Sequence, residues 1–244
     1  MRQCSNQNMR QALLLACLLT FAQGCSSTPK KPSEESWLIP FRRQWDREIP
    51  DKKYTVIRVN DLIRKKEDSL RFEVRPTDTR SEIFTNRLAL SNTETWYAFS
   101  VYLPATFPEE SVPVTLAEWE NSNAMSWEEN RLPILLFQYQ NHEFSIRYRG
   151  EKVAHVQERF TGHWNDFRVQ VKWSHGLDGY INVWLNDRQI LKYVGKITNQ
   201  DGQNAFFRFG IKREETNQTY VAYFSEVRQG SNESDVLLPG QTLH

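Results

Sequence analysis

Cysteine is scarce in this chain. Its three cysteines, Cys4, Cys17 and Cys25, all lie within the first 25 of the 244 residues. A domain built from the rest of the chain therefore has no disulfide and no thiol nucleophile. Its stability has to come from a hydrophobic core, and any covalent catalysis through sulfur is excluded.

The chain also lacks an excess of either charge, with 31 Lys and Arg against 30 Asp and Glu. Two of the positive charges, Arg2 and Arg10, lie in the leader, and without them 29 positive residues face 30 negative ones. A net charge of −1 argues against nucleic acid as a partner. It is compatible with an anionic polysaccharide, which needs only a locally basic surface.

Long hydrophobic runs are missing too. The apolar stretch Ala12–Ala22 is too short to span a bilayer as a mature helix, and it follows Arg2 and Arg10 with no acidic residue between them. This arrangement is typical of an export signal. We expect residues 1–24 to be a signal peptide.

The end of this leader, Gly24-Cys25-Ser26, resembles a bacterial lipobox. The resemblance makes Cys25 the lipidated first residue of the mature protein, with residues 25–36 as a flexible tether. The domain would then reach the membrane through its lipid anchor only. Ser26 favours the outer membrane, with the domain facing the periplasm or the cell surface. An ordinary secretory signal or an uncleaved anchor is the alternative.

Apolar and polar residues alternate with period two through much of residues 37–244, which predicts half-buried strands. The helical candidates are short, and turn residues at 174–179 and at Asn186-Asp187 predict hairpins. We expect one all-β domain, an antiparallel two-sheet β-sandwich, in which Trp173 and Trp184 belong to the core. The expected strands cover residues 54–59, 69–75, 80–83, 96–103, 114–119, 134–139, 144–148, 167–173 and 180–185.

Several motifs along residues 69–230 resemble one family. They are Phe72-Glu73-Val74-Arg75-Pro76, Arg80-Ser81-Glu82-Ile83, the Trp164-Asn165-Asp166-Phe167 run, Val183-Trp184-Leu185-Asn186 and Arg208-Phe209-Gly210-Ile211-Lys212-Arg213. Together they resemble the concanavalin-like jelly rolls of bacterial polysaccharide lyases, the heparin lyase I and glucuronan lyase group. The resemblance implies a jelly roll that acts on a uronate-containing polysaccharide by β-elimination. It also allows a bound Ca²⁺, although no compact Asp/Asn loop demands one, and we expect no other cofactor.

Elimination at a 4-linked uronate needs a group that neutralises the substrate carboxylate, a base for the C5 proton and an acid for the departing O4. In the family, a Gln-Trp-His strand and a Lys-Phe-Gly-Ile-Tyr-Arg strand carry these groups. Here the resemblance places Glu118-Trp119-Glu120 on the first strand and residues 208–213 on the second. Glu118 and Glu120 thus replace Gln and His, and Arg208 and Lys212 replace Lys and Tyr.

Strand geometry places Glu118 and Glu120 on one face, with Trp119 on the opposite face. Arg208 and Lys212, four residues apart, also share a face. If both strands line one groove, two acids face two bases. Lys212 could then act as the base and Arg208 could bind a uronate, while the catalytic roles of Glu118 and Glu120 stay open.

Two further residues are candidates for substrate binding. Arg80 either binds a substrate carboxylate or pairs internally with Glu82. Trp127, in a loop, is an exposed candidate for stacking on a sugar ring. None of the five histidines has metal-ligand spacing to another His or to Cys, so we expect no metal site.

Two alternatives to a lyase remain open. The change from Gln-Trp-His to Glu-Trp-Glu favours a non-catalytic polysaccharide-binding lipoprotein on the same fold, with a salt-bridged groove. A glycoside hydrolase using Glu118 and Glu120 is the other, because retaining hydrolysis requires two carboxyl groups about 5–5.5 Å apart. Related glycosidases place an Asp between the two Glu, which this chain lacks.

Overall fold

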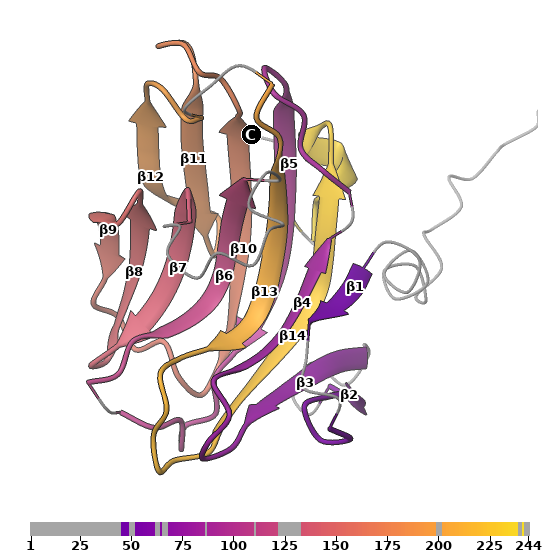
Figure 1. Ribbon diagram of the computed structural model, residues 1–244, viewed down its shortest axis with the longest axis vertical. Helices are drawn as coiled ribbons and strands as arrows, with labels where there is room; N and C mark the ends of the chain where they lie inside the picture. The colour runs from indigo at the N-terminus through magenta and orange to yellow at the C-terminus, as the bar shows by residue number, and fades with distance from the viewer. Residues whose placement is uncertain are drawn as a thin grey trace, which may run out of the picture. The chain divides into compact units, whose positions relative to one another are not determined.

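The chain folds into two antiparallel sheets, seen in the computed structural model (Figure 1). The first sheet has the strand order β1-β4-β13-β6-β7-β8-β9, and the second has the order β12-β11-β10-β5-β14-β3-β2. The structure describes residues 45–48, 52–61, 64, 68–85, 87–109, 111–121, 133–198, 202–238 and 241. The expected signal peptide, Cys25, the tether and Trp127 lie outside these residues.

The strands of the first sheet are β1 (Trp45–Glu48), β4 (Arg80–Thr85), β6 (Val114–Asn121), β7 (Leu135–Gln140), β8 (Glu143–Tyr148), β9 (Glu151–Val156) and β13 (Ala205–Lys212). Those of the second are β2 (Val56–Asn60), β3 (Asp68–Val74), β5 (Glu94–Tyr102), β10 (Trp164–Lys172), β11 (Tyr180–Leu185), β12 (Arg188–Val194) and β14 (Tyr220–Gly230). The predicted all-β, antiparallel two-sheet sandwich is therefore confirmed.

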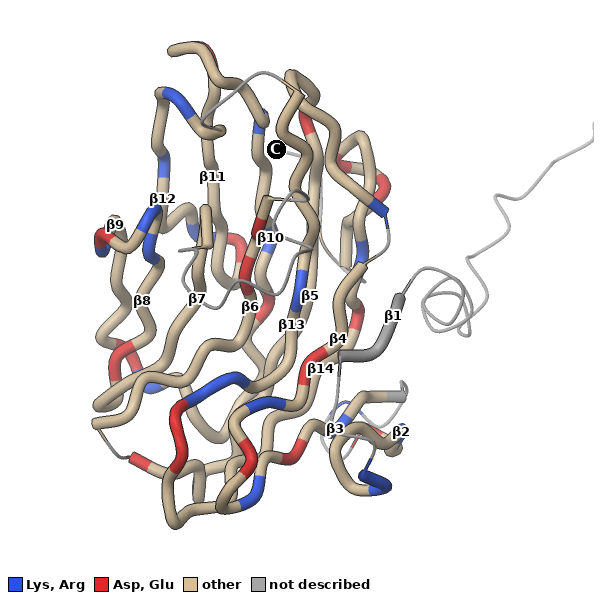
Figure 2. The backbone as a smooth tube through the Cα atoms, viewed as in Figure 1, with Lys and Arg blue, Asp and Glu red and all other residues tan. Residues whose placement is uncertain are grey.

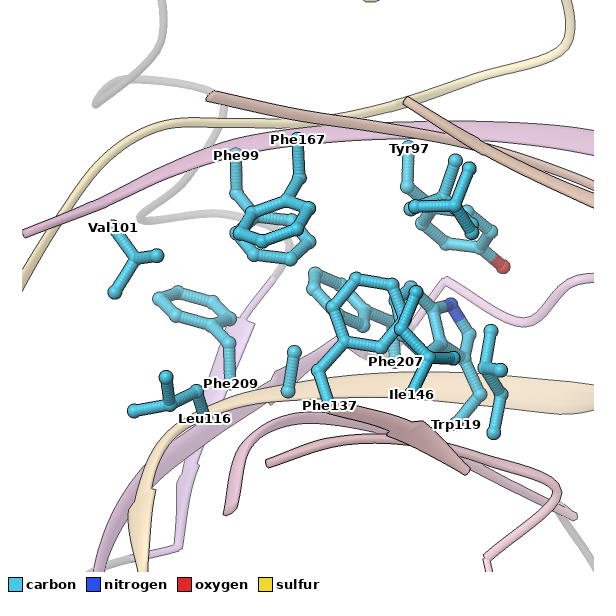
Figure 3. Close-up of a cluster of buried hydrophobic side chains, with 14 of the residues drawn as sticks. Tyr97, Phe99, Val101, Leu116, Trp119, Phe137, Ile146, Phe167, Phe207 and Phe209 are labelled. Atoms are coloured by element: carbon cyan, nitrogen blue, oxygen red, sulfur yellow. The ribbon is translucent and has the colours of Figure 1, made fainter. Parts of the chain in front are cut away.

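A hydrophobic core fills the space between the sheets (Figure 3). Aromatic rings from both sides meet there: Phe99 stacks on Phe167 within the second sheet at 5.1 Å, and Trp119 stacks on Phe207 within the first at 4.6 Å between ring centroids. Phe137 of the first sheet reaches across to Phe167 at 5.3 Å. Aromatic side chains carry large apolar areas, so their burial supplies much of the stability of the sandwich.

Tight turns set the hairpins in register. Asn141 and His142 connect β7 to β8 with φ of 50° and 64°, and Asn186 and Asp187 connect β11 to β12 with φ of 49° and 63°. Two consecutive positive φ values characterise the type I′ turn, whose twist matches that of paired strands. The predicted turn at Asn186-Asp187 is thus confirmed.

The structure corrects the expectation for one tryptophan. Trp173 is fully buried in the core, as predicted, but Trp184 lies on the opposite face of its sheet and stacks on Trp96 at 5.8 Å. Its neighbours Val183 and Leu185 take the inward positions, and strand parity then sends Trp184 outward. Residues 236–238, after the short 3₁₀ helix η2 (Glu233–Asp235), pack over Trp96.

No helix in the described part of the chain is both long and apolar enough to cross a membrane.

Candidate active site on the first sheet

Three neighbouring strands of the first sheet, β4, β13 and β6, carry charged side chains on the face that points away from the core. Residues paired across the strands share a face, and the register pairs Arg208 with Glu118, Gly210 with Glu82, and Lys212 with Arg80. Figure 2 shows acidic residues on β6 and β4 beside basic residues on β13. We call this the charged face; its members are Arg80, Glu82, Glu118, Glu120, Arg208 and Lys212.

Strand alternation explains why these residues are brought together. Ile83, Trp119, Phe207 and Phe209 occupy the intervening positions and are buried in the core, so their charged neighbours must face outward. The predictions that Glu118 and Glu120 share a face and that Trp119 points away from it are confirmed.

Gly210 allows β13 to approach β4 closely between the two bases. Its φ is 141°, and a Cβ atom at this position would lie 2.3 Å from the carbonyl oxygen of Ser81 and 2.8 Å from Cα of Glu82. Only glycine fits such a backbone without displacing a neighbouring strand. The residue therefore keeps Arg208 and Lys212 on either side of Glu82.

Arg208 lies at the centre of the charged face. Its Nη1 atom is 3.2 Å from Oε1 of Glu118, 3.7 Å from Oε1 of Glu120 and 3.8 Å from Oε2 of Glu82. Lys212 holds Glu118 from the other side, with Nζ 3.2 Å and 3.3 Å from its two carboxylate oxygens. Three acids thus share one guanidinium nitrogen, and one of them also binds the lysine.

The centre of the charged face is buried and its margin is open. Glu118 and Glu82 are 0% and 1% exposed, whereas the side chains of Lys212 and Arg80 retain 33% and 35% of their exposure. The side chain of Glu120 retains 16%. Arg80 and Lys212, and to a lesser degree Glu120, are therefore open to solvent, while Glu118 and Glu82 are closed off from it.

Burial and a neighbouring acid raise the pKa of two carboxyl groups. Burial, together with the nearby charge of Glu118, raises the pKa of Glu82 to about 8. The same two causes raise the pKa of Glu120 to about 7, although Arg208 and Lys212 oppose them. A carboxyl group with a pKa near neutrality can take or give a proton at physiological pH, which an ordinary surface glutamate cannot.

Polar side chains continue this face across the remaining strands of the sheet. Lys212 pairs with Thr115, Thr115 with Gln138, Gln138 with Ser145, and Ser145 with His155 on β9. Paired residues lie about 5 Å apart from strand to strand. The row therefore forms an extended polar track that runs across the strands from the charged face.

The structure brings together five of the residues singled out from the sequence: Arg80, Glu118, Glu120, Arg208 and Lys212. Two others, Trp127 and Cys25, lie outside the described residues. Glu82 joins the cluster as a third acid, although the sequence presented it only as a partner of Arg80; those two side chains are 4.0 Å apart. Within the described residues, no group of three or more His, Cys, Asp or Glu is arranged to hold a metal ion.

Comparison with known proteins agrees with this architecture. A family model described as polysaccharide lyase matches residues 42–228. No curated protein sequence matches the chain. Among solved structures, an endo-β-1,4-glucuronan lyase from the fungus Trichoderma reesei superposes with a TM-score of 0.63 at 19% identity, over 79% of this chain and 93% of that one.

Two further structures illustrate the range of this fold. An alginate lyase of polysaccharide lyase family 7 matches with a TM-score of 0.58 at 13% identity, over 77% of this chain and 94% of its own. A GH131 β-glucanase catalytic domain from Podospora anserina matches with a TM-score of 0.56 at 10% identity, over 80% and 86%. At these identities the likeness shows the fold alone.

The two sheets, their order and these neighbours define a lyase-type jelly roll, which confirms the predicted fold. Since the family model covers most of the sequence, the chain belongs to the polysaccharide lyase family.

Proposed function

We propose that this protein cleaves a uronate-containing polysaccharide by β-elimination, with the charged face as its active site. The observation that carries the proposal is the cluster on β4, β6 and β13, where accessible cations lie beside a carboxyl group whose pKa is close to neutrality. Membership of the polysaccharide lyase family supports the reaction class.

The accessible cations suit an acidic polymer. Arg80 and Lys212 are opposed to each other across β4 and β13, and both have side chains about one-third exposed. A guanidinium can bind a carboxylate through two parallel hydrogen bonds, and an ammonium adds a point charge. On the polar track beyond this pair, Thr115 and Ser145 are buried, and Gln138 and His155 are the members that can hydrogen-bond to an extended chain.

Glu120 is the base in this proposal. Its carboxylate would take the C5 proton of the uronate, the C–H electrons would form the C4=C5 double bond, and the C4–O4 bond would break. The departing O4 would accept a proton from the ammonium of Lys212. A base with a pKa of about 7 is well matched to this task, since about half of it is ionised at neutral pH and the ionised form is still basic enough to take a proton.

Glu118 and Arg208 hold the reacting groups in place. Glu118 is fully buried between Arg208 and Lys212 and accepts hydrogen bonds from both. A carboxylate so engaged orients Lys212 instead of contacting the substrate, and Arg208 in turn holds Glu120 at 3.7 Å. This arrangement also weighs against Glu118 as the nucleophile of a glycosidase.

The leader sequence suggests where the reaction takes place. We propose that residues 1–24 are removed, that Cys25 is lipidated and that residues 25–36 tether the domain to the outer membrane. Growth with labelled palmitate, followed by isolation of the protein, tests this point. Label in the native chain and none in Cys25→Ser is the expected result, and equal labelling of both contradicts it.

One observation favours a second function, binding without cleavage. Lys212 and Arg208 are already ion-paired to Glu118, so the cations that would stabilise a transition state are partly neutralised. A protein of this kind would bind an acidic polysaccharide along the polar track and leave it intact.

Ultraviolet absorbance decides between these functions, because elimination creates an unsaturated uronate that absorbs in the far ultraviolet and hydrolysis does not. The purified protein is incubated with a panel of polymers that includes glucuronan and alginate. We expect absorbance to rise with one of them, and to rise at least about 100-fold more slowly for Glu120→Gln. Glu158→Gln, a change at an exposed glutamate paired with Arg188, is the matched control. Retention of a polymer with no change in absorbance would contradict cleavage and support binding.

A further inference from the structure

The charged face contains more acid than its central guanidinium can neutralise. Glu82, Glu118 and Glu120 all lie within 3.8 Å of Nη1 of Arg208. We infer that Glu82 is a positioning residue that keeps its proton at neutral pH, and that this proton gives the charged face the net positive charge needed to bind a uronate carboxylate. The inference rests on the proposed function, because it concerns how the same site accepts its substrate.

Counting the charges shows why a proton matters. Arg80, Arg208 and Lys212 supply three positive charges, and three ionised glutamates would cancel them. With Glu118 and Glu120 ionised, the state in which Glu120 can act as a base, a neutral Glu82 leaves the face with a net charge of +1 before any substrate arrives. An anion would then enter an attractive site instead of a balanced one, in a setting where the low local dielectric strengthens the attraction.

The surroundings of Glu82 favour its neutral form. It is 1% exposed, and its Oε2 atom accepts no hydrogen bond from any described residue. The nearest cations, Arg208 and Arg80, are 3.8 Å and 4.0 Å from this oxygen, too far for hydrogen bonds. A buried ionised carboxylate with an oxygen that accepts no hydrogen bond carries a large desolvation cost, which protonation lowers.

The groups that face Glu82 come from three strands. Arg80 on β4, and Arg208 and Lys212 on β13, favour its ionised form, whereas Glu118 on β6 opposes it. Burial is the strongest influence and also opposes ionisation, and the sum raises the pKa of Glu82 to about 8. Arg208 and Lys212 are in turn shared with Glu118 and Glu120, which weakens their effect on Glu82.

The inference predicts proton-linked binding. As the pH rises through about 8, Glu82 loses its proton and the net positive charge disappears. Affinity for an anionic oligosaccharide should then fall by up to tenfold per pH unit. A residue that merely supports the fold would not give this dependence.

The test measures the affinity of the full-length protein for a fluorescent β-1,4-glucuronate tetramer, by anisotropy at pH 7 and pH 9. Readings are taken before any unsaturated product absorbs. We expect the native protein to bind about tenfold more weakly at pH 9. Glu82→Gln, which is neutral at every pH, should keep its affinity within about twofold at pH 7 and lose less than about threefold at pH 9. Glu158→Gln should behave like the native protein.

A second measurement covers the case in which Glu82→Gln does not fold. Calorimetric titration of the native protein with the tetramer at pH 8.5, in phosphate and in Tris, counts the protons taken up, because the two buffers differ in ionisation heat. We expect uptake of about half a proton or more. Zero uptake, equal affinity at both pH values, or no binding at either pH would overturn the inference. Binding without any unsaturated product would overturn the proposed cleavage and leave the role of Glu82 intact.

Discussion

Two buried glutamates, one on each sheet, show how neighbouring charges determine the behaviour of the same side chain. Glu73 lies on β3 of the second sheet and Glu82 on β4 of the first, and they are 6% and 1% exposed. Burial alone would raise the pKa of both. Arg75 and Arg71 hydrogen-bond to Glu73 and hold its pKa below the usual range, whereas the pKa of Glu82 rises to about 8.

The difference lies in the ratio of acids to bases. On the second sheet, Arg71 and Arg75 both pair with the single carboxylate of Glu73, which is an ordinary structural arrangement. Three carboxylates share Arg208 on the first sheet, at distances of 3.2–3.8 Å. Burial and like charges that shift the pKa of a carboxyl group towards neutrality are common at functional sites, where such a group can exchange a proton, so this cluster is a candidate site.

Removal of Arg208 should have the largest effect. Arg208→Met would leave three acids around an apolar side chain, so we expect a loss of about 3–5 kcal/mol in the free energy of unfolding at pH 8. The loss should shrink at pH 5, where Glu82 and Glu120 are neutral in the folded protein. Urea unfolding at both pH values measures it, and equal losses at the two would show that the carboxyl groups are not involved.

The next largest effect should be on the pH dependence of stability, which should differ between the native protein and Glu82→Gln. Its folded pKa lies above the unfolded value of 4.5, so the folded state holds a proton that the unfolded state releases. The contribution of this proton to stability is complete below pH 4.5 and is lost as the pH rises towards about 8. Relative to Glu82→Gln, the native protein should lose about 1.4 kcal/mol per pH unit within this window. A constant difference between the two proteins from pH 5 to pH 8 would contradict the raised pKa.

The two glutamates should respond in opposite directions to the same substitution. At pH 7, Glu73→Gln removes charge-assisted hydrogen bonds from Arg71 and Arg75, and we expect a loss of about 1.5–3 kcal/mol in the free energy of unfolding. Glu82→Gln should raise it, because no proton has to be bound on folding. Denaturant unfolding measures the free energy of unfolding of both variants. If both substitutions lowered it, Glu73 and Glu82 would not differ in the way proposed.

An exposed pair should show the smallest effect. Arg188 and Glu158 are 2.8 Å apart, but their side chains are 58% and 69% exposed. Solvent screens such pairs, so Arg188→Met should change the free energy of unfolding by less than about 1 kcal/mol at either pH. A larger change would mean that the free energy of unfolding of this protein responds to the loss of any charge. The comparison between Glu73 and Glu82 would then be weaker.

Much of the fold is predictable from the sequence because period-two alternation and turn residues act locally. That is why the strands from β2 to β8, the Asn186-Asp187 turn and the shared face of Glu118 and Glu120 follow from the sequence alone. The prediction that Trp184 fits the alternation as a core residue misreads it, because strand parity between Val183 and Leu185 sends Trp184 outward.

The third acid of the site could not be predicted in the same way. Glu82 and Glu118 are brought together only because β13, from near the end of the chain, lies between β4 and β6. Alternation shows which face a residue takes but not which strands become neighbours. From the sequence, Glu82 is expected only as a partner of Arg80. In the structure, Glu82 on β4 also faces Arg208 on β13, opposite Glu118 on β6.

The most direct test of this account is an NMR titration of the glutamate side-chain carboxyl carbons, with Glu73→Gln and Glu82→Gln used to assign the two signals. The account predicts that the Glu82 carbon titrates with a midpoint near pH 8, and that the Glu73 carbon titrates below the usual glutamate range. If both carbons titrated below pH 4.5, the charged face would be an ordinary set of ion pairs, and the case for a proton-dependent site on the first sheet would be lost.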